Sequence, residues 1–315
     1  MGGLLGRRDE AVLRDPALDR ALHRDGFAVT RLIDAEDAAA MHREYEELRG
    51  PARPERQAHQ PPDFEIALWA DDVPYRQRLD ELIGRYTDRA VESLLEHHRP
   101  IGRSAMVKWP ALPDQEAWDG VPDTFHNDWS YVDERSGDRT YGIWLALQDV
   151  DERNGCVFVV PHSHRLDRTL RGWGVDSPWV RHHEVFEARA VPVTLRAGEA
   201  YVWDPALVHR SGVNSTGSPR VAASILTARP GSQLSLVRRR DDITAERVEL
   251  GRDFFCSGDV AGIEGLPACE VLPLELADLS DREGARRLDR HARAHRVERL
   301  ASRPWRSARP VGAGR

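Results

Sequence analysis

Lysine is almost absent from this chain, because Lys108 is the one lysine among 45 lysine and arginine residues. A general preference for arginine explains most of the excess of arginine over lysine. The compact lysine ammonium and the planar arginine guanidinium are, however, not interchangeable at tight sites. The lysine retained at position 108 therefore predicts a role in a pocket.

Cysteines and long apolar segments are scarce as well. The three cysteines, Cys156, Cys256 and Cys269, are widely spaced and form no CxxC pair, which argues against a zinc knuckle or a redox motif. No apolar run reaches the roughly 18 residues that a membrane helix needs, and the N-terminus lacks the charged-then-apolar order of a secretion signal. We expect reduced thiols, no membrane association and a cytoplasmic protein.

The charge balance argues against nucleic acid as a partner. The formal net charge is -7, although residues 282–315 carry eleven arginines. Acidic residues precede those arginines and few aromatic residues accompany them, so a solvated terminal helix is the preferred interpretation. The hydrophobic content of 40% and the charged content of 31% are typical of an ordinary globular protein.

The order of the patterns predicts helices first and strands later. Apolar residues at helical spacing predict helices over 9–25, 34–49 and 75–98. A period of two then takes over, and turns rich in Gly, Asn, Ser and Pro separate predicted strands at 104–109, 141–150, 156–160, 191–195, 200–203 and 220–228. A mainly β protein with flanking helices follows, and its short strands are typical of a jelly roll or a sandwich.

We expect a single domain over residues 1–315. In this interpretation residues 1–100 form a helical N-terminal support, residues 101–230 the jelly-roll core, and residues 231–315 a C-terminal extension. The long insertion between strands at about 165–190 has the length of a lid.

Three residues predict a metal site. His126 and Asp128 form a His-x-Asp pair, and His209 follows 81 residues after Asp128. In a strand or tight turn the first two side chains point to the same side, and a distant histidine can complete the set. Two imidazoles and one carboxylate on one face of an ion leave three positions open, which suits a non-haem Fe(II) oxygenase. No His-Glu-x-x-His motif is present, which argues against a zinc-dependent hydrolase.

The chain resembles the phytanoyl-CoA dioxygenase family of Fe(II)/2-oxoglutarate oxygenases over roughly residues 20–230. Three motifs in order carry the resemblance: His126-Asn127-Asp128, the segment 154–165 (NGCVFVVPHSHR), and the segment 209–220, which begins HRSGVNST and ends at Arg220. One departure is His162, which stands where the family usually has the glycine of Pro-Gly-Ser-His. Glycine there commonly serves a left-handed turn, which histidine tolerates at some cost.

The resemblance implies a double-stranded β-helix of the jelly-roll, cupin-like kind, with iron at its open mouth. It implies Arg220 as the clamp on the distal carboxylate of 2-oxoglutarate, helped by the Ser211 hydroxyl, and a guanidinium suits that task because it can donate two parallel hydrogen bonds. It also implies co-substrate contacts from Trp144 and Lys108. Fe(II), 2-oxoglutarate and O2 are the expected cofactor and co-substrates.

The expected reaction is hydroxylation of an unactivated C–H bond of a small metabolite, as in secondary metabolism, with release of succinate and CO2. Desaturation and cyclisation stay open on the same centre, and the alternative is a non-catalytic, cupin-like binding protein. A CoA thioester, a carrier-bound molecule and a free metabolite are all open as substrates, as is the oligomeric state. Four tryptophans are candidates for an apolar pocket wall, and four arginines are candidates for an anionic substrate: Trp118, Trp129, Trp173 and Trp179, and Arg135, Arg139, Arg165 and Arg171.

Overall fold

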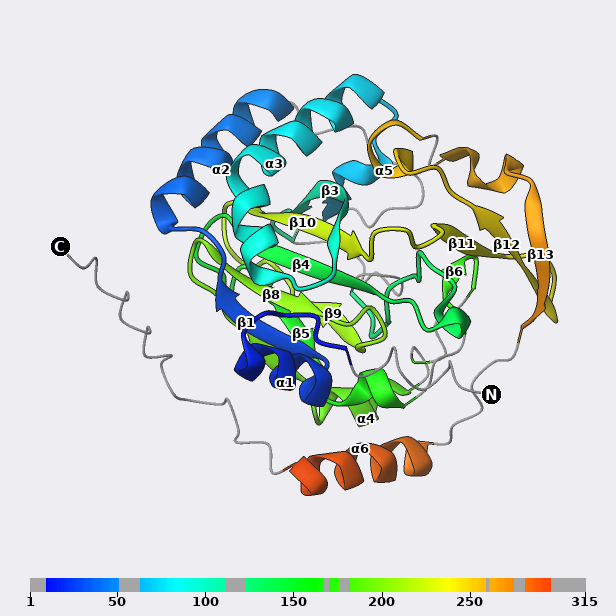
Figure 1. The fold of residues 1–315 in the computed structure, drawn as a ribbon. Helices are drawn as coiled ribbons and strands as arrows, with labels where there is room; N and C mark the ends of the chain where they lie inside the picture. Colours follow the sequence, from blue (N-terminus) through cyan, green and yellow to red (C-terminus); the bar gives the residue numbers. More distant parts are fainter. Residues whose placement is uncertain are drawn as a thin grey trace.

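In the computed structural model two antiparallel sheets face each other, and helices cover the outer side of the larger one (Figure 1). The structure describes residues 10–50, 63–111, 123–166, 170–175, 179, 182–258, 261–274 and 281–295. The larger sheet has the strand order β1-β8-β4-β10-β3-β2 and the smaller one the order β7-β5-β9. This arrangement confirms the predicted fold class, a mainly β jelly roll with flanking helices.

Seven of the nine strands of these two sheets lie where the sequence predicts a strand, including β1 within 27–33, whereas β2 and β9 were not predicted. Their bounds are β1 Phe27–Arg31, β2 Phe64–Ile66, β3 Arg99–Lys108, β4 Thr140–Ala146, β5 Val157–Val159, β7 Val191–Val193, β8 Glu199–Trp203, β9 His209–Ser211 and β10 Arg220–Ala228. The prediction started β3 five residues too late, because Pro100 and Gly102 have the character of a stop signal. Gly102 instead makes room for Phe255, whose Cβ would lie 2.4 Å from a Cβ at this position.

The three N-terminal helices are α1 (Pro16–Asp25), α2 (Ala35–Arg49) and α3 (Val73–Leu94). The prediction of a helix from residue 9 was wrong in its first part. Asp15 caps the helix, because its carboxylate accepts hydrogen bonds from the backbone N–H groups of Ala17 and Leu18, and Pro16 occupies the first turn. The predicted end of the third helix, His98, was also too late.

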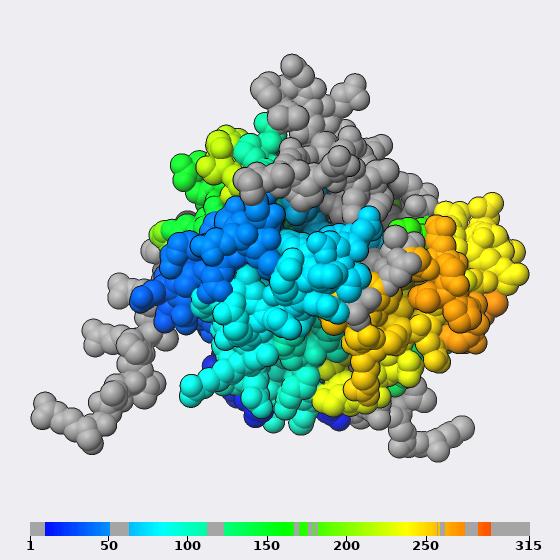
Figure 2. All heavy atoms as spheres, turned by 90° about the horizontal axis from the view of Figure 1, so that it is seen from above, coloured from blue at the N-terminus to red at the C-terminus, as the bar shows by residue number. Residues whose placement is uncertain are grey.

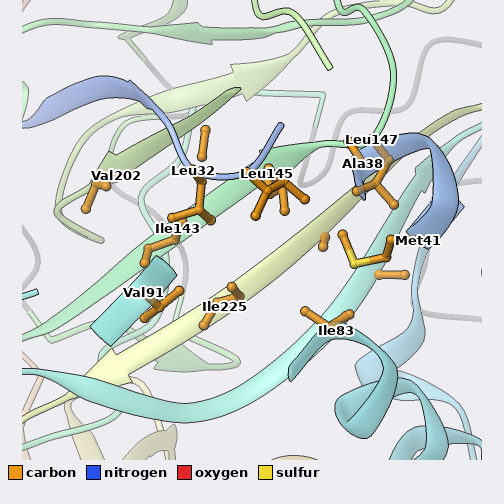
Figure 3. Close-up of a cluster of buried hydrophobic side chains, with 14 of the residues drawn as sticks. Leu32, Ala38, Met41, Ile83, Val91, Ile143, Leu145, Leu147, Val202 and Ile225 are labelled. Atoms are coloured by element: carbon orange, nitrogen blue, oxygen red, sulfur yellow. The ribbon is translucent and has the colours of Figure 1, made fainter. Parts of the chain in front are cut away.

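The outer face of the larger sheet packs against these helices. Along β4, Ile143 and Leu145 point to the helical side, where they meet Met41 of α2 and Ile83 of α3 (Figure 3). The period of two predicted for this strand is therefore confirmed. The main hydrophobic core lies between the sheet and the helices.

The inner face of the larger sheet packs against the smaller sheet. Trp144 and Ala146 of β4 point to this side, together with Tyr201 and Trp203 of β8, and they meet a side-chain layer that includes Val157 and Val159 of β5. The predicted strand 141–150 was too long, because β4 ends at Ala146 and Gln148 lies beyond it. The space between the two sheets is therefore lined with large aromatic side chains toward one end.

The chain after residue 230 adds a second layered unit beside the sandwich. Strands β11 (Ser235–Arg239), β12 (Thr244–Glu249) and β13 (Ala268–Pro273) form an antiparallel sheet, which β6 (Gly172–Trp173) joins in parallel. The helix α5 (Phe254–Ser257) packs near α3, and Figure 2 shows the yellow and orange atoms of this part next to the cyan atoms of α3. β6 comes from the predicted insertion at 165–190 and binds it to the C-terminal sheet.

The last described helix, α6 (Asp281–His295), packs near α4 (His183–Glu187), as the lower part of Figure 1 shows. Arg189 and Asp289 form an ion pair of 3.0 Å between the two segments. The predicted terminal helix is thus present up to residue 295, and the arginines of 296–315 lie outside the described residues. Within the described ranges we find no helix with the length and apolar character of a membrane span. The division of the chain into three parts of one domain stays a prediction.

Candidate active site

His126, Asp128 and His209 converge at one end of the sandwich, and one ligand atom from each lies within 4.8 Å of the others. Oδ1 of Asp128 is 3.9 Å from Nε2 of His126 and 3.7 Å from Nε2 of His209. The imidazole rings have their centroids 4.4 Å apart. Two nitrogens and one oxygen thus surround a common point, as a metal ion requires.

Backbone hydrogen bonds bring the two distant histidines together. The N–H of His126 donates to the carbonyl of His209 at 3.0 Å, and the N–H of His209 donates back at 2.8 Å. His209 belongs to β9 of the smaller sheet, and the N–H of Asp128 donates to the carbonyl of Pro205 just before that strand. A bridge of this kind places both imidazoles on the same side, so the register of a few residues determines the whole site.

Backbone carbonyls also orient both imidazoles. Nδ1 of His126 lies 2.8 Å from the carbonyl of Thr124, and Nδ1 of His209 lies 2.8 Å from the carbonyl of Leu207. Each Nδ1 therefore carries the proton, and each Nε2 presents its lone pair to the common point. Burial, together with the nearby His209, lowers the pKa of His126 to about 4, so this imidazole is neutral at physiological pH, which is the metal-binding form.

The carboxylate of Asp128 is held from the side that faces away from the histidines. Its Oδ2 accepts a hydrogen bond of 2.8 Å from Nε1 of Trp203, which leaves Oδ1 to face the imidazoles. The indole of Trp203 lies across Gly142 of the neighbouring strand, where a Cβ would be 2.2 Å from the ring. Sequence patterns did not reveal either residue's part in the site.

Arg220 is fully buried at the start of β10, and none of its three guanidinium nitrogens has a hydrogen-bond partner among the described residues. Its Cζ lies 4.9 Å from the centroid of Trp144. Burial lowers the pKa of Arg220 to about 10, so the group is still charged at neutral pH. A buried cation without a partner is costly, and a carboxylate is the ligand that would satisfy it.

A row of aromatic rings connects the three converging residues with Arg220. The ring of Trp203, which holds Asp128, lies 5.0 Å from that of Tyr201, and Tyr201 lies 5.9 Å from Trp144, on which Arg220 stacks. Burial and the Asp128 carboxylate raise the pKa of Tyr201, and the Arg220 guanidinium opposes that shift. The charges of Asp128 and Arg220 therefore both act on the Tyr201 hydroxyl. Sequence patterns did not reveal this residue.

Lys108 lies opposite Arg220 in the register of β3 and β10 and is completely buried. Its Nζ is 2.9 Å from Oδ2 of Asp63 and 2.5 Å from Oδ1 of Asp123. Burial raises the pKa of the Asp123 carboxyl, and Lys108 opposes this. Lys108 is thus buried against two carboxylates that sequence patterns did not reveal, and both its pocket role and a contact with 2-oxoglutarate stay predictions.

Ser211 and His162 have different surroundings. Ser211 is buried at the end of β9, two residues after His209, and its Cα pairs with that of Val157. His162 has the left-handed backbone expected of the family's glycine, with φ 70°. Its Nδ1 lies 2.8 Å from the carbonyl of Arg24 at the end of α1. This contact and its burial suit a reshaped turn.

A cavity of about 300 Å³ opens beside the three converging residues, with His126 and Asp128 in its wall. Trp129 and Trp173 line it as expected, and Trp69 is a third tryptophan that the sequence analysis missed. Trp179 is instead buried in a separate cluster with Phe125 and Phe186, and Trp118 lies outside the described residues. The cavity therefore lies directly against two of the three converging residues.

The sequence profile described as phytanoyl-CoA dioxygenase (PhyH) matches residues 22–222, which include all three motifs and the converging residues. The chain belongs to the phytanoyl-CoA dioxygenase family. It is therefore a member of a family of 2-oxoglutarate-dependent non-haem iron oxygenases, with His126, Asp128 and His209 as the candidate metal ligands.

Curated relatives match only part of this chain. The peroxisomal phytanoyl-CoA dioxygenase of Homo sapiens is 27% identical over 139 residues, which is 41% of this chain and 41% of that protein. Phytanoyl-CoA dioxygenase domain-containing protein 1 of Danio rerio is 28% identical over 104 residues, 31% of this chain and 36% of that protein. The chain thus covers well under half the length of these relatives.

Two solved structures are similar over most of the chain. The epimerase SnoN, in complex with Fe3+, alpha ketoglutarate and nogalamycin RO, matches with a TM-score of 0.51 and 21% identity, over 84% of this chain and 97% of that one. The carbocyclase SnoK from nogalamycin biosynthesis matches with a TM-score of 0.50 and 18% identity, over 83% and 95%. At these identities the likeness concerns the fold.

Proposed function

We propose that this protein is an Fe(II)/2-oxoglutarate-dependent dioxygenase that hydroxylates an unactivated C–H bond of a small molecule. The observation that carries the proposal is the pairing of a three-residue metal site with a buried, unpartnered guanidinium at the far end of an aromatic row. A protein that only binds a metal has no need for the buried cation, whose desolvation is costly without a carboxylate.

The residues present suit the metal and the keto acid. His126, His209 and Asp128 would hold Fe(II) through two neutral nitrogens and one carboxylate oxygen, a set that leaves three positions open. Arg220 would bind the distal carboxylate of 2-oxoglutarate through parallel charge-assisted hydrogen bonds. Ser211, Trp144 and Lys108 belong to the same proposed co-substrate site, and we add Tyr201, whose ring lies between those of Trp203 and Trp144.

When bound, ferrous iron with 2-oxoglutarate and O2 supplies the oxidation: one oxygen atom enters the C–H bond, and the other leaves in succinate as CO2 is released. The protein positions these partners and excludes water. Trp203 keeps Oδ2 of Asp128 occupied, so that Oδ1 alone faces the imidazoles. The carbonyls of Thr124 and Leu207 hold both Nδ1 protons in place, which keeps both Nε2 atoms available.

The test is anaerobic loading with Fe(II), followed by O2 and 2-oxoglutarate, with succinate as the product that is measured. We expect succinate from the wild type even without substrate, and none above background from His126→Ala. The exposed His97, on the turn after α3, offers the control His97→Ala, which should keep wild-type turnover. Equal succinate from wild type and His126→Ala would overturn the proposal.

A further inference from the structure

Three tryptophan rings form one continuous wall of the cavity beside the metal site. The centroid of Trp69 lies 5.4 Å from that of Trp129 and 5.5 Å from that of Trp173, and Trp129 and Trp173 are 5.7 Å apart. Tilted and edge-to-face contacts at these distances are favourable. The rings therefore hold one another in place and give the cavity a preorganised aromatic surface.

Strands of the larger sheet add further apolar residues to the cavity wall. Among them are Met106 of β3, Ile66 of β2 and Leu226 of β10, and Phe255 of α5 also lines the cavity. Leu226 and Phe255 lie beyond residue 222, where the match to the family profile ends. Part of the cavity wall thus comes from the C-terminal part of this chain.

The arginine that lines this cavity and the four arginines predicted to bind an anion already have partners. Arg103, which lines it, pairs with Asp80 at 3.0 Å and also with Asp88. Arg171 donates to Glu134 at 2.6 Å and to the carbonyl of Asp128 at 2.8 Å. The other predicted anion-binding arginines are also engaged: Arg135 with Asp133 and Glu270, Arg139 with the carbonyl of Glu134, and Arg165 with the carbonyl of His23. Among the described residues, none of these cations is left to receive an anionic group.

Few polar groups of the cavity are free to bind a substrate. The hydroxyl of Ser104 accepts a hydrogen bond from the N–H of Leu68. Asn127 and Ser224 also line the cavity, and neither side chain has a hydrogen-bond partner within the described part of the chain. Asn127 follows His126 and precedes Asp128 in the chain, and it shares the cavity wall with both.

We propose that the substrate of this site is an uncharged, flat, ring-bearing molecule with few hydrogen-bonding groups, one of which contacts Asn127. This inference rests on the proposed function, because it concerns the molecule presented to the same metal site. Flat rings suit tryptophan walls, and an unpaired charge buried in such a cavity would lose its hydration without compensation. A sugar would need more polar partners than the cavity offers, and the phosphates of a CoA thioester would find no free cation among the described residues that line it.

The test uses three probes with the full chain loaded with Mn(II) and 2-oxoglutarate. The probes are 1-hydroxyanthraquinone, anthraquinone-2-sulfonate, which has the same rings and a charge, and octanoyl-CoA. Binding is measured by quenching of tryptophan fluorescence, corrected for probe absorption, and checked by calorimetry. We expect the neutral quinone to bind at least about tenfold more tightly than either anionic probe.

Three variants test whether the probes bind in this cavity. Trp69→Leu should weaken binding of 1-hydroxyanthraquinone about tenfold or more, whereas Trp109→Leu should not, because Trp109 packs against the outer core beneath Arg49. Ser224→Arg places a cation in the cavity and should improve binding of the sulfonate relative to the neutral quinone. Tighter binding of the sulfonate or of octanoyl-CoA to the wild type, or equal quinone binding by Trp69→Leu and wild type, overturns the substrate class.

A failure of the substrate class is distinguishable from a failure of the proposed function. Binding of 2-oxoglutarate to the Mn(II)-loaded protein is measured by calorimetry in the same samples. Normal keto-acid binding together with a preference for an anionic probe overturns only the substrate class. Absence of keto-acid binding together with a preference for the neutral quinone overturns the proposed function and supports the apolar specificity of the cavity.

Discussion

Nε1 of Trp203 donates a hydrogen bond of 2.8 Å to Oδ2 of Asp128. This bond determines which oxygen of the carboxylate faces the two imidazoles, because the other oxygen is engaged by the indole. Groups that orient a metal ligand from behind commonly affect the metal nearly as much as the ligand itself. Trp203 is therefore a positioning residue of the proposed iron site.

Replacement of Trp203 by Phe should weaken metal binding without removing a ligand. The ring stays apolar and aromatic, but Oδ2 of Asp128 loses its donor, so we expect metal affinity to fall by about 10–100-fold. The measurement is a calorimetric titration with Mn(II). Trp109→Phe, outside the site, is the matched control, and wild-type affinity in Trp203→Phe would show that the hydrogen bond does not orient the ligand.

Gly142→Ala should disturb the same carboxylate from a neighbouring strand. A Cβ at this position would lie 2.2 Å from the indole of Trp203, so the ring must move. We expect a loss of about 1–3 kcal/mol in the free energy of unfolding and a fall in Mn(II) affinity. Gly217→Ala is the control, since nothing lies within 4 Å of a Cβ there. A destabilised Gly142→Ala protein with normal metal affinity would contradict the link through Trp203.

Arg220→Met should abolish the binding of 2-oxoglutarate without lowering the free energy of unfolding of the ligand-free protein. The guanidinium is buried without a partner among the described residues, so its replacement by an apolar chain should leave the ligand-free protein as stable or up to about 4 kcal/mol more stable. The rise in Tm that 2-oxoglutarate produces in the Mn(II)-loaded wild type should disappear.

Arg103→Met is the contrasting variant for this experiment. Arg103 pairs with Asp80 and Asp88, so its removal should cost about 1.5–3 kcal/mol of stability, while the rise in Tm with 2-oxoglutarate remains. A full ligand-induced rise in Arg220→Met would contradict the assignment of Arg220 as the carboxylate clamp.

Acid should destabilise the metal-free protein in part through His98. Burial, together with nearby Arg229, lowers the pKa of His98 to about 4 from its ordinary 6.5. As the pH falls from about 6.5 toward 4, the unfolded chain takes up a proton that the folded protein resists, so stability present at pH 7 is lost. His98→Leu should reduce the loss between pH 7 and pH 5 by about 2 kcal/mol.

Urea unfolding at the two pH values, with a chelator present, measures this difference. His97→Leu is the matched control, because the neighbouring His97 is exposed and should leave the pH dependence as in the wild type. An unchanged acid loss in His98→Leu would mean that other groups account for the dependence.

Local patterns were sufficient for most of the elements of the fold. Strand β10 has the predicted bounds, and the period of two predicted for 141–150 holds along β4, where Ile143 and Leu145 face the helices and Trp144 faces the smaller sheet. The error at β3 arose where a local signal competed with a tertiary contact, whereas the error at α1 overlooked the Asp15–Pro16 start signal, which is itself local. Gly102 has the character of a strand breaker, yet its missing side chain accommodates Phe255 from a distant helix, and a contact of that kind leaves no periodic trace in the sequence.

The sequence by itself determined the chemical types in the site: two histidines, an aspartate and an arginine at family spacing, with a lone lysine nearby. Only the tertiary structure decided what surrounds them, namely Trp203 behind Asp128, Tyr201 in the aromatic row, Asp63 and Asp123 around Lys108 and Trp69 in the cavity wall. The physical reason is that ligand identity follows from local chemistry, whereas orientation, charge compensation and cavity shape depend on side chains that meet from distant strands.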